Sequence, residues 1–174
     1  ILVHQTLQQP SLTRKCDSSD YHILCAQAKN SHPVNTRFLA KDGNHVFITS
    51  RSGNGILKSW DGSGNATNGI EAADNVCKKS AQEAALDSPT TYKAYIYDSK
   101  TVASQRFVNK HKKYYSLNGV HVANNFDQLI YNPLSQSFTA LNSPVRFDEY
   151  GTPVNADSKI IAIRPESLAS SAQA

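Results

Sequence analysis

Small and apolar side chains recur with the period of an α-helix between residues 70 and 86. They form one broad stripe that includes Ile70, Cys77 and Ala81, and lysine, glutamine and glutamate fall on the opposite face. This pattern predicts an amphipathic helix over residues 70–86 whose alanine-rich face packs against the rest of the protein.

Runs rich in β-branched and aromatic residues predict the strands. We expect longer strands at residues 46–50, 91–97 and 159–163, and short strand-like pieces at 114–115, 120–123 and 129–131. Two more segments favour a helix or a turn: residues 20–29, which follow an N-capping Ser19 or Asp20, and residues 99–108.

These elements predict an α+β domain with a small antiparallel sheet, one or two helices and long loops. We expect residues 1–40 to form an irregular N-terminal segment, residues 41–165 the domain, and residues 166–174 a flexible tail. Residues 51–69 are so rich in Gly, Asn and Ser that they predict a long exposed loop with one apolar anchor, Trp60.

Composition narrows the class of protein. The 174 residues are enough for one domain with its own core, and the 39% hydrophobic content excludes an intrinsically disordered chain. No run approaches the roughly 20 apolar residues of a membrane-spanning helix. The absence of Met and the many Asn, Ser and Thr residues are compatible with an exported, processed protein. A net charge of +4 favours an anionic partner, but it is too small for a dedicated nucleic-acid-binding protein.

Three cysteines leave one thiol over in an oxidising compartment. Their spacing favours a Cys16–Cys25 disulfide that closes a small loop, with Cys77 buried and free. The alternative is that all three are reduced thiols. No two of them have the Cys-x-x-Cys spacing of a metal site.

Four segments follow one another in a recognisable order: Val-Phe-Ile-Thr-Ser at 46–50, Asn-Gly at 54–55, Gly-Ile-Glu-Ala-Ala-Asp-Asn-Val-Cys at 69–77, and Tyr-Lys-Ala-Tyr-Ile-Tyr-Asp-Ser at 92–99. In order and spacing they resemble a family of bacterial domains of unknown function, found in secreted and surface proteins and related to C-type-lectin-like and endostatin-like folds. A looser likeness continues through Arg106 and the tyrosine pair at 114–115, so that the resemblance covers roughly residues 46–141.

The resemblance implies a C-type-lectin-like fold in a secreted or surface-exposed protein. In relatives the helix cysteine usually pairs with a cysteine of the last strand, but residues 159–163 contain none, which leaves Cys77 without that partner. C-type lectins that bind sugars through calcium carry Glu-Pro-Asn or Gln-Pro-Asp, followed by Trp-Asn-Asp. None of these tripeptides occurs in the chain, which disfavours a calcium-dependent lectin.

A basic and aromatic segment carries most of the candidate ligand-binding residues. Aromatic rings beside cations can stack on sugars, bases or other planar groups. The candidate set is Trp60, Arg106, Lys110, His111, Lys112, Lys113, Tyr114 and Tyr115. The alternative is an ordinary solvated strand edge, which lysines commonly protect from unwanted pairing.

One loop begins like a calcium site, with Asp61, Ser63 and Asn65 at alternate positions. However, Ala66 and Ala72 stand where an EF-hand requires Gly and Glu, which favours a solvated loop. We therefore predict no metal site and no cofactor.

Nucleophilic catalysis would require Cys77 beside His111 or His121. Cys77 lies on the apolar face of the predicted helix, where a thiol is usually inert. Residues 146–150 contain two adjacent carboxylates, which we interpret as part of a polar turn. No catalytic residue is therefore predicted.

The sequence favours a binding module over an enzyme. The hypothesis is a secreted or surface-exposed adhesion module, with a virulence-associated effector as one form of it. It would recognise an extracellular glycan, a matrix protein or a surface protein through the loop regions 51–69 and 116–154, without calcium. The rival hypotheses are a secreted hydrolase with an unrecognised site and a structural or oligomerising module.

Overall fold

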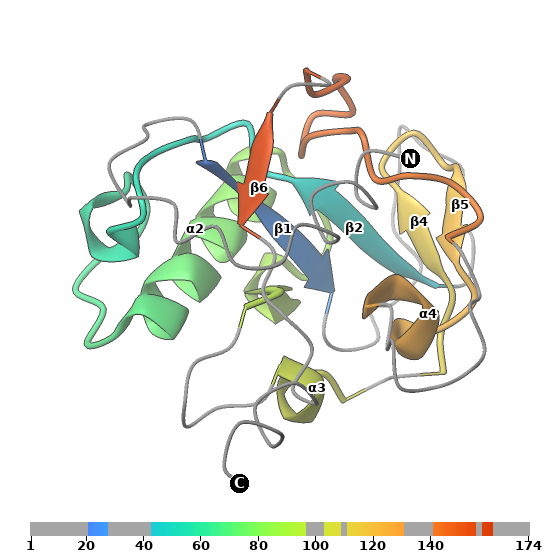
Figure 1. Ribbon diagram of the computed structural model, residues 1–174, viewed down its shortest axis with the longest axis horizontal. Coiled ribbons are helices and arrows are strands. Elements are labelled where there is room, and N and C mark those ends of the chain that lie inside the picture. The colour runs from blue at the N-terminus through green and yellow to red at the C-terminus, as the bar shows by residue number, and fades with distance from the viewer. Residues whose placement is uncertain are drawn as a thin grey trace, which may run out of the picture.

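The computed structural model describes residues 21–27, 43–96, 103–108, 111–130, 141–155 and 158–161 (Figure 1). Six strands in this part of the chain form one sheet. They are β1 (Tyr21–Gln27), β2 (Asn44–Ile48), β3 (Tyr92–Ala94), β4 (Tyr114–Ser116), β5 (His121–Ala123) and β6 (Lys159–Ile161). The α+β class predicted from the sequence, with a small sheet and few helices, is confirmed.

The sheet is mixed, so the prediction of an antiparallel sheet is wrong for two of its pairings. The strands run in the order β3-β1-β2-β4-β5, and β6 also pairs with β1. The β2–β4 and β1–β6 pairs are parallel, and the β1–β2, β1–β3 and β4–β5 pairs are antiparallel. A parallel pair needs a long crossover, and α2 (Gly69–Glu83) lies within the connection from β2 to β4.

Helix α2 confirms the period predicted for residues 70–86. Asn68 caps its first turn, because the Asn68 side chain accepts a hydrogen bond from the Glu71 N–H at 2.9 Å. The alanine-rich stripe, with Val76 and Cys77, is buried against the sheet. The remaining helices are short: η1 (Leu57–Ser59), η2 (Pro89–Thr91), α3 (Ala103–Arg106) and α4 (Phe126–Ile130).

Helix α4 corrects the prediction of a strand at residues 129–131, of which residue 131 lies outside the described residues. The Asn125 side chain accepts a hydrogen bond from the Gln128 N–H at 2.8 Å, an interaction that favours a helical turn. Phe126 and Leu129, three positions apart, are then buried in one cluster on the same side. An apolar pair at this spacing shares one face of a helix but not one face of a strand.

Strand β1 corrects two predictions about the first 40 residues. Residues 20–29 were expected to be helical, but residues 21–27 form a strand near the middle of the sheet. Cys25 belongs to the cluster beneath α2, and Leu24 belongs to the cluster on the other face. Because both faces of β1 are buried, its sequence lacks the apolar–polar alternation of a half-buried strand. The sheet therefore includes residues that precede the predicted domain boundary at 41, whereas the predicted tail lies outside the described residues.

Two hydrophobic clusters cover the two faces of the sheet. One lies between the sheet and α2 and includes Phe47 and Tyr92. The other lies on the opposite face, where Phe107 and Phe126 stack with ring centroids 4.6 Å apart. Tyr114 packs beside them, 6.4 Å from the Phe126 ring.

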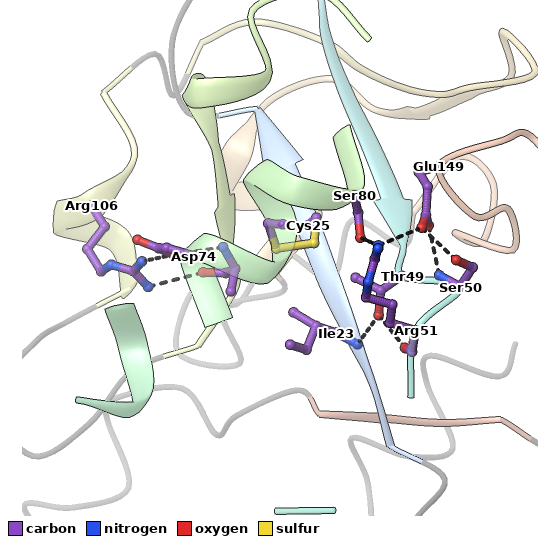
Figure 2. The surroundings of a disulfide bond; sticks show 11 residues. Ile23, Cys25, Thr49, Ser50, Arg51, Asp74, Ser80, Arg106 and Glu149 are labelled. Carbon is purple, nitrogen blue, oxygen red and sulfur yellow. Dashed lines mark hydrogen bonds and ion pairs between the residues drawn. A yellow bond between two sulfur atoms is a disulfide. The ribbon is translucent and has the colours of Figure 1, made fainter. Parts of the chain in front are cut away.

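The disulfide joins Cys25 of β1 to Cys77 of α2, with their Cα atoms 5.6 Å apart (Figure 2). The predicted Cys16–Cys25 bond with a free Cys77 is therefore wrong, because a cysteine forms one disulfide at a time. Cys16 lies outside the described residues. Short sequence spacing favoured the wrong pair, whereas the fold places Cys25 on the face of β1 that packs under α2, opposite the inward stripe of the helix.

Candidate functional site

Trp60 lies in the core and does not offer its ring to a ligand. Its relative exposure is 6%, and its indole N–H donates a hydrogen bond to the Asn54 carbonyl oxygen at 2.8 Å. Gly53 lies against the ring so closely that a Cβ atom there would come within 2.6 Å of it. Trp60 therefore anchors the 51–69 loop, as the sequence predicted, but does not form a binding surface.

Arg106 closes the outer edge of β3. Its guanidinium donates to the carbonyl oxygens of Ala94 at 3.1 Å and Ile96 at 2.9 Å, and it pairs with the Asp74 carboxylate. The same carboxylate accepts the Ala94 N–H at 3.0 Å. The ion pair thus satisfies backbone groups that an edge strand leaves open, and Arg106 is committed to the fold rather than to a ligand.

The two tyrosines of the candidate set are buried. Burial raises the pKa of Tyr114 to about 12. Tyr115 packs against the His121 ring at a centroid distance of 5.2 Å. Both side chains therefore fill the core and its border instead of presenting a flat surface.

The basic residues of this segment that the structure describes lie where β4 begins. His111 and Lys113 are exposed, Lys112 is half-buried, and Lys110 lies outside the described residues. The Lys113 carbonyl oxygen accepts the Asn44 N–H at 2.8 Å, which joins the segment to the start of β2. Among the described members of the candidate set, the fold thus keeps these three basic residues at the surface and separates them from Trp60.

A second polar cluster, absent from the sequence prediction, lies at the opposite end of β2 (Figure 2). Arg51 donates to Asp61 at 3.1 Å and to the Ser80 hydroxyl at 2.9 Å, pairs with Glu83, and lies 3.8 Å from Glu149. These partners come from the loop after β2, from α2 and from residues 141–155. One side chain, which is 17% exposed, therefore holds three segments together. We call these five residues the Arg51 cluster.

Electrostatics stabilise the charged forms within the Arg51 cluster. Burial by itself lowers the pKa of Arg51, but hydrogen bonds to Glu83 and Asp61 raise it above its usual value overall. Hydrogen bonds from Lys79 and then from Arg51 hold the pKa of Asp61 below its usual value. The cluster is therefore a network of charges that compensate one another.

Glu149 is the most buried charged member, with a side-chain exposure of 0%. Its carboxylate accepts the Ser50 N–H at 2.7 Å and the Ser50 hydroxyl at 2.6 Å. The predicted polar turn at residues 146–150 is present as a tight hairpin, but both of its carboxylates, Asp148 and Glu149, are buried. No sequence signal marked Glu149, whereas Arg51 directly follows a predicted strand, from which a long side chain can reach across the end of the sheet.

Thr49 fixes the backbone that leads into Arg51. Its hydroxyl accepts the Ile23 N–H at 2.9 Å and donates to the Arg51 carbonyl oxygen at 2.8 Å. The His22 ring nitrogen Nδ1 lies 2.8 Å from the Thr49 carbonyl oxygen. The first residues of the long loop are thereby tied to β1.

Several reactive or charged side chains of the described residues are engaged within the protein. The candidate nucleophile Cys77 is oxidised to a disulfide. The described residues contain no group of three His, Cys, Asp or Glu side chains arranged to hold a metal ion. Arg51, Glu149 and Arg106 form hydrogen bonds or ion pairs within the protein.

The comparisons with known proteins give no relative. No protein-family model, no curated protein and no solved structure matches the chain. Within the described ranges, none of the helices has the length and apolar character that crossing a membrane would require.

Proposed function

We propose that this chain is a secreted or surface-exposed binding module with a C-type-lectin-like fold. It recognises a glycan, a matrix protein or a surface protein through preformed loops, without calcium. The observation that carries this proposal is the Arg51 cluster, which fixes the loop after β2 and residues 141–155 against the same end of the sheet.

The disulfide supports an extracellular location. Cys25 and Cys77 are both fully buried, and the bond between them links the sheet to its main helix. Structural disulfides of this kind form and persist in oxidising compartments and are rare in the cytosol.

Fixed loops suit recognition because ordering a loop during binding reduces affinity. In the loop after β2, the Asn54 side chain accepts the Ile56 N–H at 2.9 Å, and the Ser63 hydroxyl donates to the Lys58 carbonyl oxygen at 2.8 Å. The Ile56 side chain remains 60% exposed. The loops can therefore present a surface whose shape exists before a ligand arrives.

The basic segment is a competing surface at the other end of β2. A five-residue strand separates the two ends by roughly 15 Å. A compact ligand would therefore contact one of the two surfaces and not both. A polyanion would bind the basic segment, through His111, Lys112 and Lys113, without contacting the loop after β2. Salt dependence distinguishes the two surfaces, since exposed charges are screened at physiological ionic strength.

The test is a screen of the purified chain on glycan and extracellular-matrix arrays, at low and physiological salt, with calcium and with EDTA. Two variants accompany it: Ile56→Ser in the loop, and a triple change of Lys110, Lys112 and Lys113 to Ala. We expect EDTA-resistant binding that Ile56→Ser weakens and the lysine variant keeps. Salt-sensitive binding lost in the lysine variant would move the site to the basic segment, and a chain that binds nothing would refute the proposal.

A further inference from the structure

Residues 146–154 form a tightly hydrogen-bonded hairpin, which we call the Tyr150 hairpin. The Asp148 N–H donates to the Thr152 carbonyl oxygen at 2.9 Å, and the Val154 N–H donates to the Arg146 carbonyl oxygen at 2.7 Å. Gly151, with a φ of 77°, allows the sharp turn that follows Tyr150. In Figure 1 the orange segment that contains the hairpin lies at the end of the sheet, beyond the end of β2.

Two carboxylates on the hairpin stabilise it from inside. The buried Asp148 side chain accepts the N–H groups of Tyr150 at 2.9 Å and Thr152 at 2.8 Å. Glu149 points into the Arg51 cluster. In addition, the Phe147 carbonyl oxygen accepts the Ile48 N–H at 3.0 Å, which attaches the hairpin to the last residue of β2.

These contacts hold one aromatic side chain at the surface. Tyr150 is 52% exposed, and it is the one ring among the exposed large hydrophobic side chains of the described residues. Single exposed apolar residues are common on protein surfaces. Here, however, the backbone N–H of this residue is bonded to Asp148, and both neighbouring carboxylates are used within the protein. The backbone that carries the ring is therefore held in place before any partner arrives.

The surroundings of the ring favour a protein partner over a sugar. Recognition of a sugar requires precisely placed polar groups beside the ring, but Asp148 and Glu149 are turned inward and already accept hydrogen bonds. Arg146, Thr152 and Pro153 are the exposed neighbours within the hairpin. Tyrosine and arginine are enriched where binding energy concentrates in protein–protein interfaces, and a rigid loop can insert into a concave surface.

We infer that Tyr150 anchors a contact with another protein, in which its ring enters an apolar pocket and Arg146 meets a carboxylate at the border of that pocket. This inference rests on the proposed function, because it assumes that the loop end of the sheet is the binding surface. Of the three proposed ligand classes, it excludes the glycan and keeps the matrix protein and the surface protein.

The test measures binding of the chain to immobilised purified collagen, laminin, fibronectin and fibrinogen, with a glycan array in parallel. Tyr150→Ala should raise the Kd for the bound protein by about 30-fold or more, as expected for a dominant anchor. Tyr150→Phe keeps the ring and should stay within about threefold of the unchanged chain. Val108→Ala, at an exposed apolar residue that follows α3 and lies outside both loops, is the matched control and should leave the Kd unchanged.

Thermal unfolding separates a lost contact from a damaged fold. Because Tyr150 is exposed, Tyr150→Ala should leave the Tm unchanged, so a large loss of affinity without a change in Tm supports the inference. Protein binding that Tyr150→Ala leaves intact, or binding to glycans alone, would overturn the inference while the proposed function stands. Binding to none of the probes would overturn both.

Discussion

Replacing Cys25 and Cys77 together by alanine tests the covalent core of the structure. The two residues are 52 positions apart, so their bond closes a large loop in the unfolded chain. The chain-entropy model gives a loop of this size a stabilisation of about 4 kcal/mol, and removing a native disulfide typically costs about 2–5 kcal/mol. Alanine is chosen because serine would add an unpaired hydroxyl at a fully buried position.

The assay is urea and thermal unfolding under non-reducing conditions. A loss of about 4 kcal/mol should lower the Tm by roughly 8–16 °C for a chain of this length. This loss is a large part of the about 5–15 kcal/mol that stabilises an ordinary domain. The matched control is Cys16→Ala, which leaves the Cys25–Cys77 bond intact and should keep most of the stability.

Peptide mapping without reduction gives a second measurement that does not depend on stability. It should recover the peptides that contain Cys25 and Cys77 as one covalent species. A Cys16–Cys25 peptide, or a double alanine variant as stable as the unchanged chain, would refute the reasoning about the core.

Three further predictions concern individual side chains. Arg106→Leu leaves the Asp74 carboxylate without its ion-pair partner and should lower the free energy of unfolding by about 2 kcal/mol. Equal urea midpoints for the variant and the unchanged chain would contradict this. Glu149→Gln replaces a buried carboxylate that accepts two hydrogen bonds, and it should lower the free energy of unfolding by about 2 kcal/mol in the same urea assay. Proteases should also cleave residues 141–155 faster in this variant. Burial lowers the pKa of His45, although Asp87 raises it, so the folded protein binds a proton less readily than the unfolded chain. Stability should therefore hold above about pH 6.5 and fall as the pH drops below it, with a smaller fall in His45→Gln; a flat profile down to pH 5.5 would exclude this.

Helix α2, which buries one face, could be predicted from the sequence, whereas strand β1, which is buried on both faces, could not. Helix α2 separates its apolar and polar residues with a helical period, and its predicted position is confirmed to within a few residues at each end. Strand β1 has no such separation, because Ile23 and Leu24 point into different clusters. The local pattern of residues 20–29 therefore suggested a helix. The structure of this segment is determined instead by its pairing with strands that are distant in the sequence.

The candidate site was harder to predict because cations that look alike in sequence have different surroundings. Arg106 and Lys113 lie seven positions apart, yet one is bound within the fold and the other is exposed. Glu149 and Tyr150 are neighbours that point in opposite senses, one into the protein and one to the surface. The long-range contacts that decide these differences have no local signature in the sequence.

The pairing of β1 with β6 has a consequence for how the chain is made. The first residues of β1 pair with β6, at residues 159–161, which are synthesised more than 130 positions later. Until that segment leaves the ribosome, the first residues of β1 (Tyr21, His22 and Ile23) lack their parallel neighbour and expose backbone groups to other chains. The hydrogen-bonded neighbours of β1 are thus complete only after residues 159–161 have been synthesised.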